Sequence, residues 1–240
     1  NYINNTIIDL RSQGRAFVFS REGSSDSALI GLTFINGLTV GDLEIEDGDA
    51  YGGAVLCENG SSPLIKNCRF INNAVVGARG ADGAAGDDAP AGSGDSGDRG
   101  ADALPSESHG CGGAIACIEK SSPKIVNCYF EGNTARSGDG GDGGDGGAGD
   151  GTAGDGYGGS GGDVKGDGLG GALFADTGSL PVLMNCEFAE NSVARGIPGL
   201  AGISGDNVSD PNNIITDPND GSTIVVDGPV AGVDGVVDPN

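Results

Sequence analysis

The sequence is poor in the residues that catalytic sites and membrane spans use. It has no tryptophan, one histidine and one methionine, and aromatic residues make up only 5% of its 240 residues. The histidine, His109, lies at the end of a glycine-rich stretch, so we interpret it as a solvated loop residue rather than a general base. No run of apolar residues approaches the roughly 18 that a membrane-spanning helix needs. We therefore expect no membrane-spanning segment and no histidine-dependent chemistry.

Basic residues are scarce as well. Twelve Lys and Arg stand against 35 Asp and Glu, which gives a formal net charge of -23. Such a chain repels the phosphate backbone and anionic lipid headgroups, so we expect neither nucleic acid nor a membrane surface as a partner. The scattered basic residues also do not form the kind of site with which a lyase holds an acidic sugar chain. We expect a protein that is not an enzyme.

What the chain has in abundance is glycine, with 49 residues, and an internal repeat. Three windows of equal length align without a gap. They read GGAVLCENGSSPLIKNCRFINN at 52–73, GGAIACIEKSSPKIVNCYFEGN at 112–133 and GGALFADTGSLPVLMNCEFAEN at 170–191. Repetition of this length indicates a stack of similar structural units.

Within each window the apolar residues alternate and turn residues separate short segments, which predicts strands and no helix. Short strands that return with every repeat suit a chain that winds round a core, each strand parallel to its counterpart about 4.8 Å away. We therefore predict an all-β fold, a right-handed parallel β-helix, as a single domain over 1–240. A weaker copy at 16–37 and strand-like segments at 7–8, 214–215, 224–226 and 236–237 bring the expected number of coils to five or six.

One column of the repeat contains asparagine in all three windows. Asn67, Asn127 and Asn185 each precede the same cysteine position, where the alternation changes phase. In a stack they would lie above one another and form a hydrogen-bonded ladder. Asn73, Asn133 and Asn191 make a second such column at the end of each window.

Five of the six cysteines fall in two further columns, Cys57 with Cys117 and Cys68 with Cys128 and Cys186. One interpretation is that they are small buried residues stacked in the core. The alternative is a secreted protein with disulfides, for which Cys57 with Cys68 and Cys117 with Cys128 are candidate pairs. The sequence does not decide the connectivity.

Two glycine-rich inserts, at 77–110 and 137–169, separate the three windows. Each contains runs with glycine at every third residue, such as the run that starts at Gly77 and the run that starts at Gly138. A period of three is that of polyproline II, and glycine lets neighbouring extended chains approach closely enough to hydrogen-bond. Ordering about 30 such residues costs on the order of 30–60 kcal/mol of backbone entropy. We therefore expect both inserts to be extended polyglycine-type segments that run beside each other.

The second insert carries Asp139, Asp142 and Asp145 in a GGD run. Closely spaced carboxylates and backbone carbonyls are hard-oxygen ligands, so one interpretation is a calcium site. The alternative is solvated acidic spacing, because the run lacks the aliphatic residue of each nonapeptide calcium repeat. We expect no other cofactor.

The pairing of GGAV, GGAI and GGAL with FINN, FEGN and FAEN resembles the GGA[ILV] and FxxN repeats of the polymorphic outer membrane proteins of chlamydiae. The resemblance covers 52–191 outside the inserts, and 16–37 more loosely. It implies a right-handed parallel β-helix, secretion to the cell surface, and an adhesive or structural role.

These observations together favour a non-catalytic extracellular structural protein, a subunit of a surface fibre, surface layer or adhesin. Unpaired strand edges at both ends of a short solenoid favour self-association. The alternative is a β-helix that binds or cleaves carbohydrate, with a polysaccharide as partner, since this fold also carries such enzymes. An ice-binding role lacks the regular threonine array that it would need.

Overall fold

The structure is a computed structural model of the 240-residue chain. It describes residues 6–20, 26–44, 48–150, 153–205, 214–216 and 223–225. The chain forms two compact units, one built from 1–79, 107–138 and 165–196 and the other from 80–106, 139–164 and 197–240. The second unit contains the larger part of both predicted inserts. The single-domain organisation stays a prediction.

The first unit consists of short strands arranged in five parallel sheets, which we number in the order in which each turn of the chain visits them. Sheet 1 holds β6 (Ala50–Tyr51), β11 (Gly110–Cys111) and β16 (Gly168–Leu169). Sheet 2 holds β2 (Phe17–Phe19), β7 (Val55–Cys57), β12 (Ile115–Cys117) and β17 (Leu173–Ala175). Sheet 3 holds β3 (Ala28–Ile30), β8 (Leu64–Lys66), β13 (Lys124–Val126) and β18 (Val182–Met184).

The remaining two sheets complete each turn. Sheet 4 holds β1 (Ile7–Asp9), β4 (Thr33–Ile35), β9 (Arg69–Ile71), β14 (Tyr129–Glu131) and β19 (Glu187–Ala189). Sheet 5 holds β5 (Leu38–Val40), β10 (Ala74–Val76), β15 (Thr134–Arg136) and β20 (Ser192–Ala194). Among the described strands, sheets 2 to 5 take one strand from each of the four coils and sheet 1 takes one from the last three, which is the arrangement of a right-handed parallel β-helix and confirms the predicted fold class.

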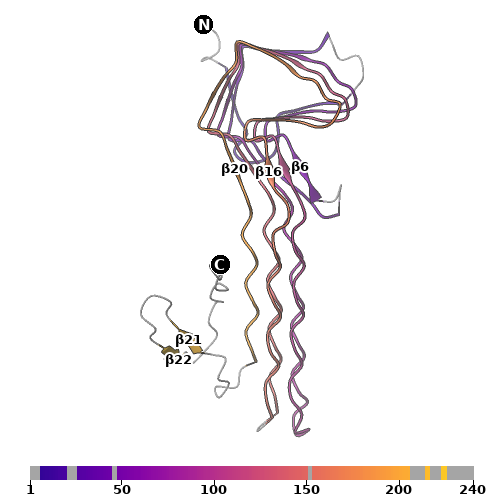
Figure 1. The fold of residues 1–240 in the computed structure, drawn as a ribbon, viewed down its shortest axis with the longest axis vertical. Coiled ribbons are helices and arrows are strands. Elements are labelled where there is room, and N and C mark those ends of the chain that lie inside the picture. The colour runs from indigo at the N-terminus through magenta and orange to yellow at the C-terminus, as the bar shows by residue number, and fades with distance from the viewer. Residues whose placement is uncertain are drawn as a thin grey trace, which may run out of the picture. The chain divides into compact units, whose positions relative to one another are not determined.

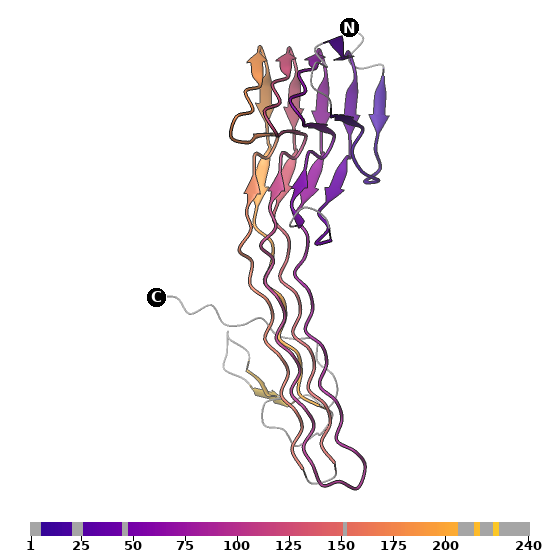
Figure 2. The same ribbon diagram turned by 90° about the vertical axis from the view of Figure 1, so that its right-hand side faces the viewer.

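Successive coils superpose because equivalent residues pair in strict register. Ala74 pairs with Thr134, an offset of 60 residues, and Thr134 pairs with Ser192, an offset of 58. Figure 1 looks along the stack, so that the coils trace over one another. Figure 2, turned by 90°, shows the equivalent strands side by side. The register makes each repeat residue the neighbour of its own counterpart.

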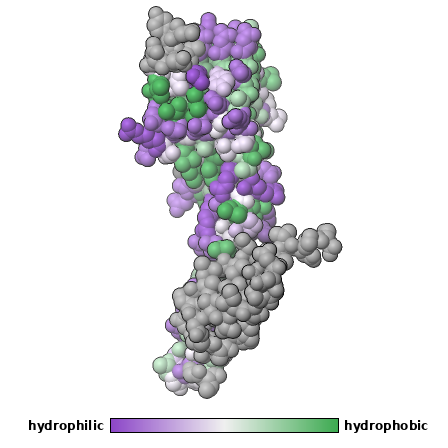
Figure 3. Space-filling model, turned by 90° about the vertical axis from the view of Figure 1, so that its left-hand side faces the viewer, coloured by the Kyte–Doolittle hydropathy of each residue, from purple (hydrophilic) through white to green (hydrophobic). Residues whose placement is uncertain are grey.

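The core lies inside the coils and is built from columns of identical or similar side chains. Phe34, Phe70, Phe130 and Phe188 stack with ring centroids 5.1, 5.0 and 4.8 Å apart. The first three are completely buried, and burial of each such side chain stabilises the fold by about 2–3 kcal/mol. The outer surface mixes hydrophobic and hydrophilic residues, as Figure 3 shows for one side. The alternating pattern of the sequence is therefore the alternation between core and surface.

The asparagine column before the cysteines is confirmed. The side-chain amide of Asn127 donates to the Oδ1 of Asn67 at 3.2 Å, and that of Asn185 donates to the Oδ1 of Asn127 at 3.3 Å. All three residues have φ between 50° and 54°, a left-handed conformation that asparagine tolerates better than most residues. This ladder lies at the surface and marks the corner between sheets 3 and 4.

The second asparagine column is a deeper ladder. Asn133 is completely buried, and its Oδ1 accepts hydrogen bonds from the backbone amide of Asn73 at 3.0 Å and from its side-chain amide at 2.9 Å. The Nδ2 of Asn133 donates to the carbonyl of Phe70 and to the Oδ1 of Asn191. The same pattern repeats one coil on, where the amide of Asn133 donates to Asn191. Each carboxamide thus satisfies polar groups of two coils.

All six cysteines have free thiols and five of them are stacked in the columns that the sequence shows, so the disulfide alternative is wrong. Cys57 pairs in register with Cys117 of the next coil. The thiol of Cys128 donates to the carbonyl of Ile65, an equivalent bond to that from Cys68 to Leu29. Small, weakly polar side chains suit a column in which every coil places the same atom at the same point.

The prediction of a further coil near the C-terminus is wrong for the described strands. β21 (Ile214–Thr216) and β22 (Thr223–Val225) pair with each other in an antiparallel hairpin and join none of the parallel sheets. The expected strand at 236–237 lies outside the described residues. Four coils and the single strand β1 are therefore described, rather than five or six coils.

We expect Asn133→Ala to lower the free energy of unfolding by about 3 kcal/mol, because it leaves the buried backbone amide of Asn73 without an acceptor and removes one of the two hydrogen bonds of its side-chain amide. Urea unfolding followed by circular dichroism measures this loss. Asn127→Gly is the matched control, since it removes two ladder bonds at the surface and keeps the left-handed conformation. Equal losses in the two variants would contradict the structural weight that we assign to the buried ladder.

Candidate functional site

The most distinctive part of the molecule is the second unit, a bundle of extended segments. We call them segment 1 (80–89), segment 2 (97–106), segment 3 (139–149), segment 4 (154–164) and segment 5 (197–205). Apart from a bridge between Ser106 and Val164, their residues belong to neither helix nor strand. Segments 1, 3 and 5 run in one direction and segments 2 and 4 in the other, as their hydrogen bonds require. The prediction of extended inserts lying side by side is confirmed.

Backbone hydrogen bonds join these segments at every third residue. Gly80, Gly83 and Gly86 donate to the carbonyls of segment 3, and Gly140, Gly143 and Gly146 donate to those of segment 5. Segment 3 exchanges bonds with all four other segments. The period of three is that of the polyproline II helix, which has no internal hydrogen bonds and so leaves its amides for its neighbours.

Glycine occupies the positions at which two segments touch. A Cβ atom on Gly144 would collide with the carbonyl of Ala84 in segment 1, and one on Gly143 with the carbonyl of Gly159 in segment 4. Segment 3 therefore needs glycine at two of every three positions. Neither residue has a positive φ, so close approach, and not an unusual backbone conformation, explains them.

Segments 1 and 5, which both bind segment 3, carry only one glycine per triplet. Hydrogen bonds such as those from Asp142 to Asp82 and from Leu200 to Asp142 relate the segments by the same offsets, 60 and 58 residues, as the coils. By these offsets Ala84 stands in segment 1 where segment 3 has Gly144, and Ala201 stands in segment 5 where segment 3 has Gly143. The glycine content of a triplet thus distinguishes an inner segment from an edge segment.

The aspartates predicted as calcium ligands occupy the one position of each triplet of segment 3 that is not glycine. Asp139, Asp142 and Asp145 each accept a hydrogen bond through Oδ1 from a segment 5 amide, with distances of 2.6, 2.8 and 2.9 Å; the donors are Ile197, Leu200 and Ile203. They are spread along the segment and do not converge. No group of three or more metal-ligating side chains is present among the residues that the structure describes. Calcium binding by these residues stays a prediction from the sequence.

Further aspartates, which sequence reasoning missed, play the same part. Asp82, Asp88 and Asp102 accept bonds from the amides of Asp142, Ala148 and Ser160. The amide of Ser160 and the guanidinium of Arg99 hold the pKa of Asp102 below its usual value. Backbone amides of the loop around Gly94 donate to the Asp150 carboxylate and lower its pKa in the same way. The offset of 60 residues between Asp82 and Asp142 was the signal that could have revealed this role.

The groups most relevant to catalysis are already engaged. His109 accepts a hydrogen bond at Nδ1 from the amide of Asp167, 3.0 Å away, and its own amide donates to Asp49. Burial, with the nearby charge of Asp49, raises the pKa of the Cys111 thiol to about 12, which keeps it neutral. Neither group is arranged as an activated base or nucleophile.

The most open part of the β-helix is its last coil, formed by β16 to β20. A cavity of about 400 Å³ there is lined by Ala172, Leu173, Phe188, Glu190 and Asn191. It contains one carboxylate beside aromatic, aliphatic and amide groups. Such a lining suits the binding of an apolar or hydrogen-bonding partner better than acid–base chemistry, which uses paired groups.

Comparison of the chain with protein-family models, curated proteins and solved structures found no match. No helix in the described ranges is long and apolar enough to cross a membrane. The candidate functional surfaces are therefore the glycine bundle and the edge of the last coil, each argued from its own geometry.

We expect Gly144→Ala to destabilise the bundle by about 3 kcal/mol, because its methyl group would force segments 1 and 3 apart. Ala85→Ser, an exposed change in the edge segment, is the control and should stay within about 0.5 kcal/mol of the parent. Thermal unfolding monitored by circular dichroism in the polyproline II region measures both. Unchanged unfolding of Gly144→Ala would contradict the close packing.

We also expect acid to loosen the bundle. Because the pKa values of Asp102 and Asp150 are lowered in the folded state, their stabilising effect is present above about pH 4 and is lost as the pH falls through the folded values. The melting temperature should therefore fall steadily from about pH 5 to pH 2. Asp102→Asn should flatten this dependence. A melting temperature of the parent chain that does not change with pH would refute the stabilising role of these carboxylates.

Proposed function

We propose that the protein is a non-catalytic extracellular structural protein, a subunit of a surface fibre, surface layer or adhesin. In this proposal the β-helix is a scaffold, and the glycine bundle is the element that it carries. The observation that supports it most is the use of the repeated polar residues. The asparagines of the coils and the aspartates of the bundle are engaged in internal hydrogen bonds that hold equivalent segments together.

The charge distribution fits a solvated surface element. The bundle segments and their connections, at 80–106, 139–164 and 197–205, contain twelve aspartates and a single basic residue, Arg99. Such a surface is soluble and repels copies of itself at low ionic strength. Salt or divalent cations would weaken this repulsion and favour packing of one molecule on another.

The strand edges supply the contact for self-association. In the described part of the chain, strands β17 to β20 are the last members of their sheets and have no neighbour on one side. A row of unpaired amides and carbonyls readily pairs with another chain. A contact between unlike ends of the solenoid does not close on itself and so builds a fibre.

Light scattering on the purified chain at increasing concentration, with and without calcium, tests the proposal. We expect the average mass to rise with concentration and with ionic strength, and electron microscopy to show regular assemblies. A monodisperse monomer under every condition would overturn self-association. Retention or cleavage of a polysaccharide by that monomer would establish the carbohydrate-directed alternative instead.

A further inference from the structure

The last coil repeats the interior of the β-helix but lacks the cover that each earlier coil has. Phe130 is completely buried between Phe70 and Phe188, whereas Phe188 is 47% exposed. The same contrast separates buried Ile125 from its register partner Leu183, which is 39% exposed. The side chains that fill the core elsewhere thus form an apolar surface at this end.

The polar groups of the last coil show which chemistry would cover that surface. In the two preceding coils the backbone amides of Asn73 and Asn133 each donate to the Oδ1 of the asparagine one coil further on. The backbone amide of Asn191 makes no hydrogen bond to any residue that the structure describes. At the equivalent position of the two preceding coils the acceptor is the carboxamide oxygen of the next asparagine in the column.

The position of the aromatic partner follows in the same way. Every phenylalanine of the stack precedes its ladder residue by three positions, as Phe130 precedes Asn133 and Phe188 precedes Asn191. A segment that places a phenyl ring about 5 Å above Phe188 therefore places an asparagine above Asn191 if it has the spacing FxxN. The cavity lined by Leu173, Phe188 and Asn191 leaves room for such side chains.

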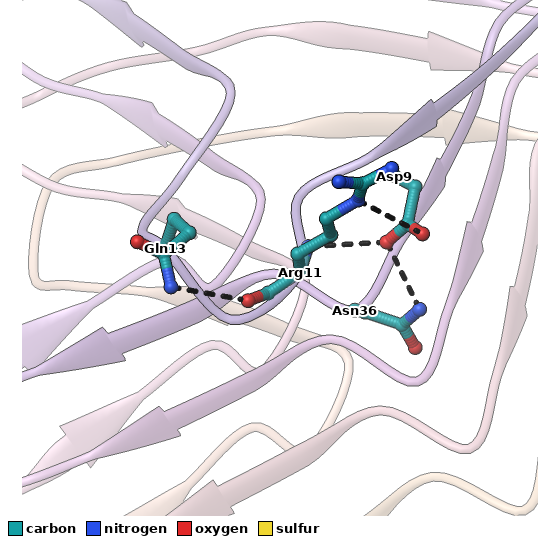
Figure 4. Close-up of polar contacts among 4 residues, drawn as sticks. All are labelled: Asp9, Arg11, Gln13 and Asn36. Atoms are coloured by element: carbon teal, nitrogen blue, oxygen red, sulfur yellow. Dashed lines mark hydrogen bonds and ion pairs between the residues drawn. The ribbon is translucent and has the colours of Figure 1, made fainter.

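The first coil of a second copy does not offer these groups. β1 pairs with β4 as far as Asp9 opposite Ile35, and the chain then turns, with the amide of Ser12 bound to the carbonyl of Asn36, the residue before Gly37. Gly37 holds the position that precedes Asn73 in the ladder, and no asparagine lies in this turn. Figure 4 shows the amide of Arg11 and the Asn36 side chain bound to the Asp9 carboxylate. Ile8 stands opposite Phe34 in place of a phenylalanine. The N-terminal edge of a second copy thus offers an apolar residue to the surface around Phe188, but no asparagine that could accept the Asn191 amide.

We infer that the edge formed by β17 to β20 is a docking surface for one further β-helical coil with the FxxN spacing. This occupant is a segment of alternating apolar residues whose phenylalanine stacks on Phe188 and whose asparagine accepts the Asn191 amide. The inference deepens the proposed structural role and rests on it, since it names the chemistry of the partner at the same edge.

A peptide with the sequence of residues 112–133, the second of the three repeat windows, is the probe. Its cysteines are replaced by alanine (C117A and C128A), and a fluorescent label reports binding to the full chain by anisotropy. We expect saturable binding, weakened at least tenfold by Phe130→Ala or Asn133→Ala in the peptide. Equal binding of these variant peptides, or no binding of the parent peptide, would overturn the inference.

Variants of the full chain locate the surface. Phe188→Glu should weaken peptide binding at least tenfold, and Leu180→Glu, at an exposed residue outside the strands, should leave it unchanged. Amide hydrogen exchange of Asn191 gives a second readout in the unaltered chain, and we expect the peptide to slow it. Unchanged exchange at Asn191 under saturating peptide would overturn the proposed docking surface even if Phe188→Glu failed to fold.

The outcomes separate this inference from the broader proposal. A chain that self-associates in light scattering but ignores the peptide would overturn the FxxN docking surface and leave the structural role standing. A monomeric chain that binds the peptide would sustain the docking surface and overturn self-association.

Discussion

Register between repeats is the constraint on which the rest of the structure depends. Because equivalent residues pair across offsets of 60 and 58 residues, every side chain meets its own counterpart about 4.8 Å away. Such a neighbour must be compatible with itself. Phenylalanine stacks on phenylalanine, cysteine on cysteine, and the asparagine carboxamide offers both a donor and an acceptor. A charged side chain in such a column would repel its copies, which explains why the interior columns consist of apolar side chains or of neutral polar ones such as asparagine and serine.

The same offsets govern the glycine bundle, although nothing there resembles a hydrophobic core. Its cohesion comes from backbone hydrogen bonds between segments, and close packing at glycine replaces the burial of apolar side chains. The aspartate carboxylates add further hydrogen bonds between segments, because they accept from backbone amides, such as that of Leu200, that have no carbonyl opposite them. A glycine-rich chain loses much conformational entropy when it folds. Here the hydrogen bonds that each triplet makes to neighbouring segments offset this loss, in place of the burial of large side chains.

Much of this could be predicted from the sequence, because repetition makes local patterns unambiguous. The alternation around Ile125 and Phe130 predicts strands, and the shared column of Asn67, Asn127 and Asn185 predicts the stack. The role of Asp142 was not predicted, because the carboxylate binds an amide 58 residues away whose position depends on packing. The hairpin formed by β21 and β22 was missed as well, since alternation predicts a strand but not its partner. The sequence predicts open edges at both ends of the solenoid, but it places a further coil in the segments after residue 213, so the exposure of Phe188 at the last described coil was not predicted.

The difference between the two offsets bears on how such proteins change in length. The offset is 60 at Asp82 and still 60 at Asp88, but 58 at Asp102, so the second hairpin of the bundle is shorter by two residues and loses them near its tip. Within the straight segments a one-residue deletion would rotate every following side chain by a third of a turn and drive a Cβ into a neighbour's backbone. Tips can therefore gain or lose single residues during evolution. The straight segments can change in length only by whole triplets, and a triplet must be removed together from an outgoing segment and from the segment that returns beside it.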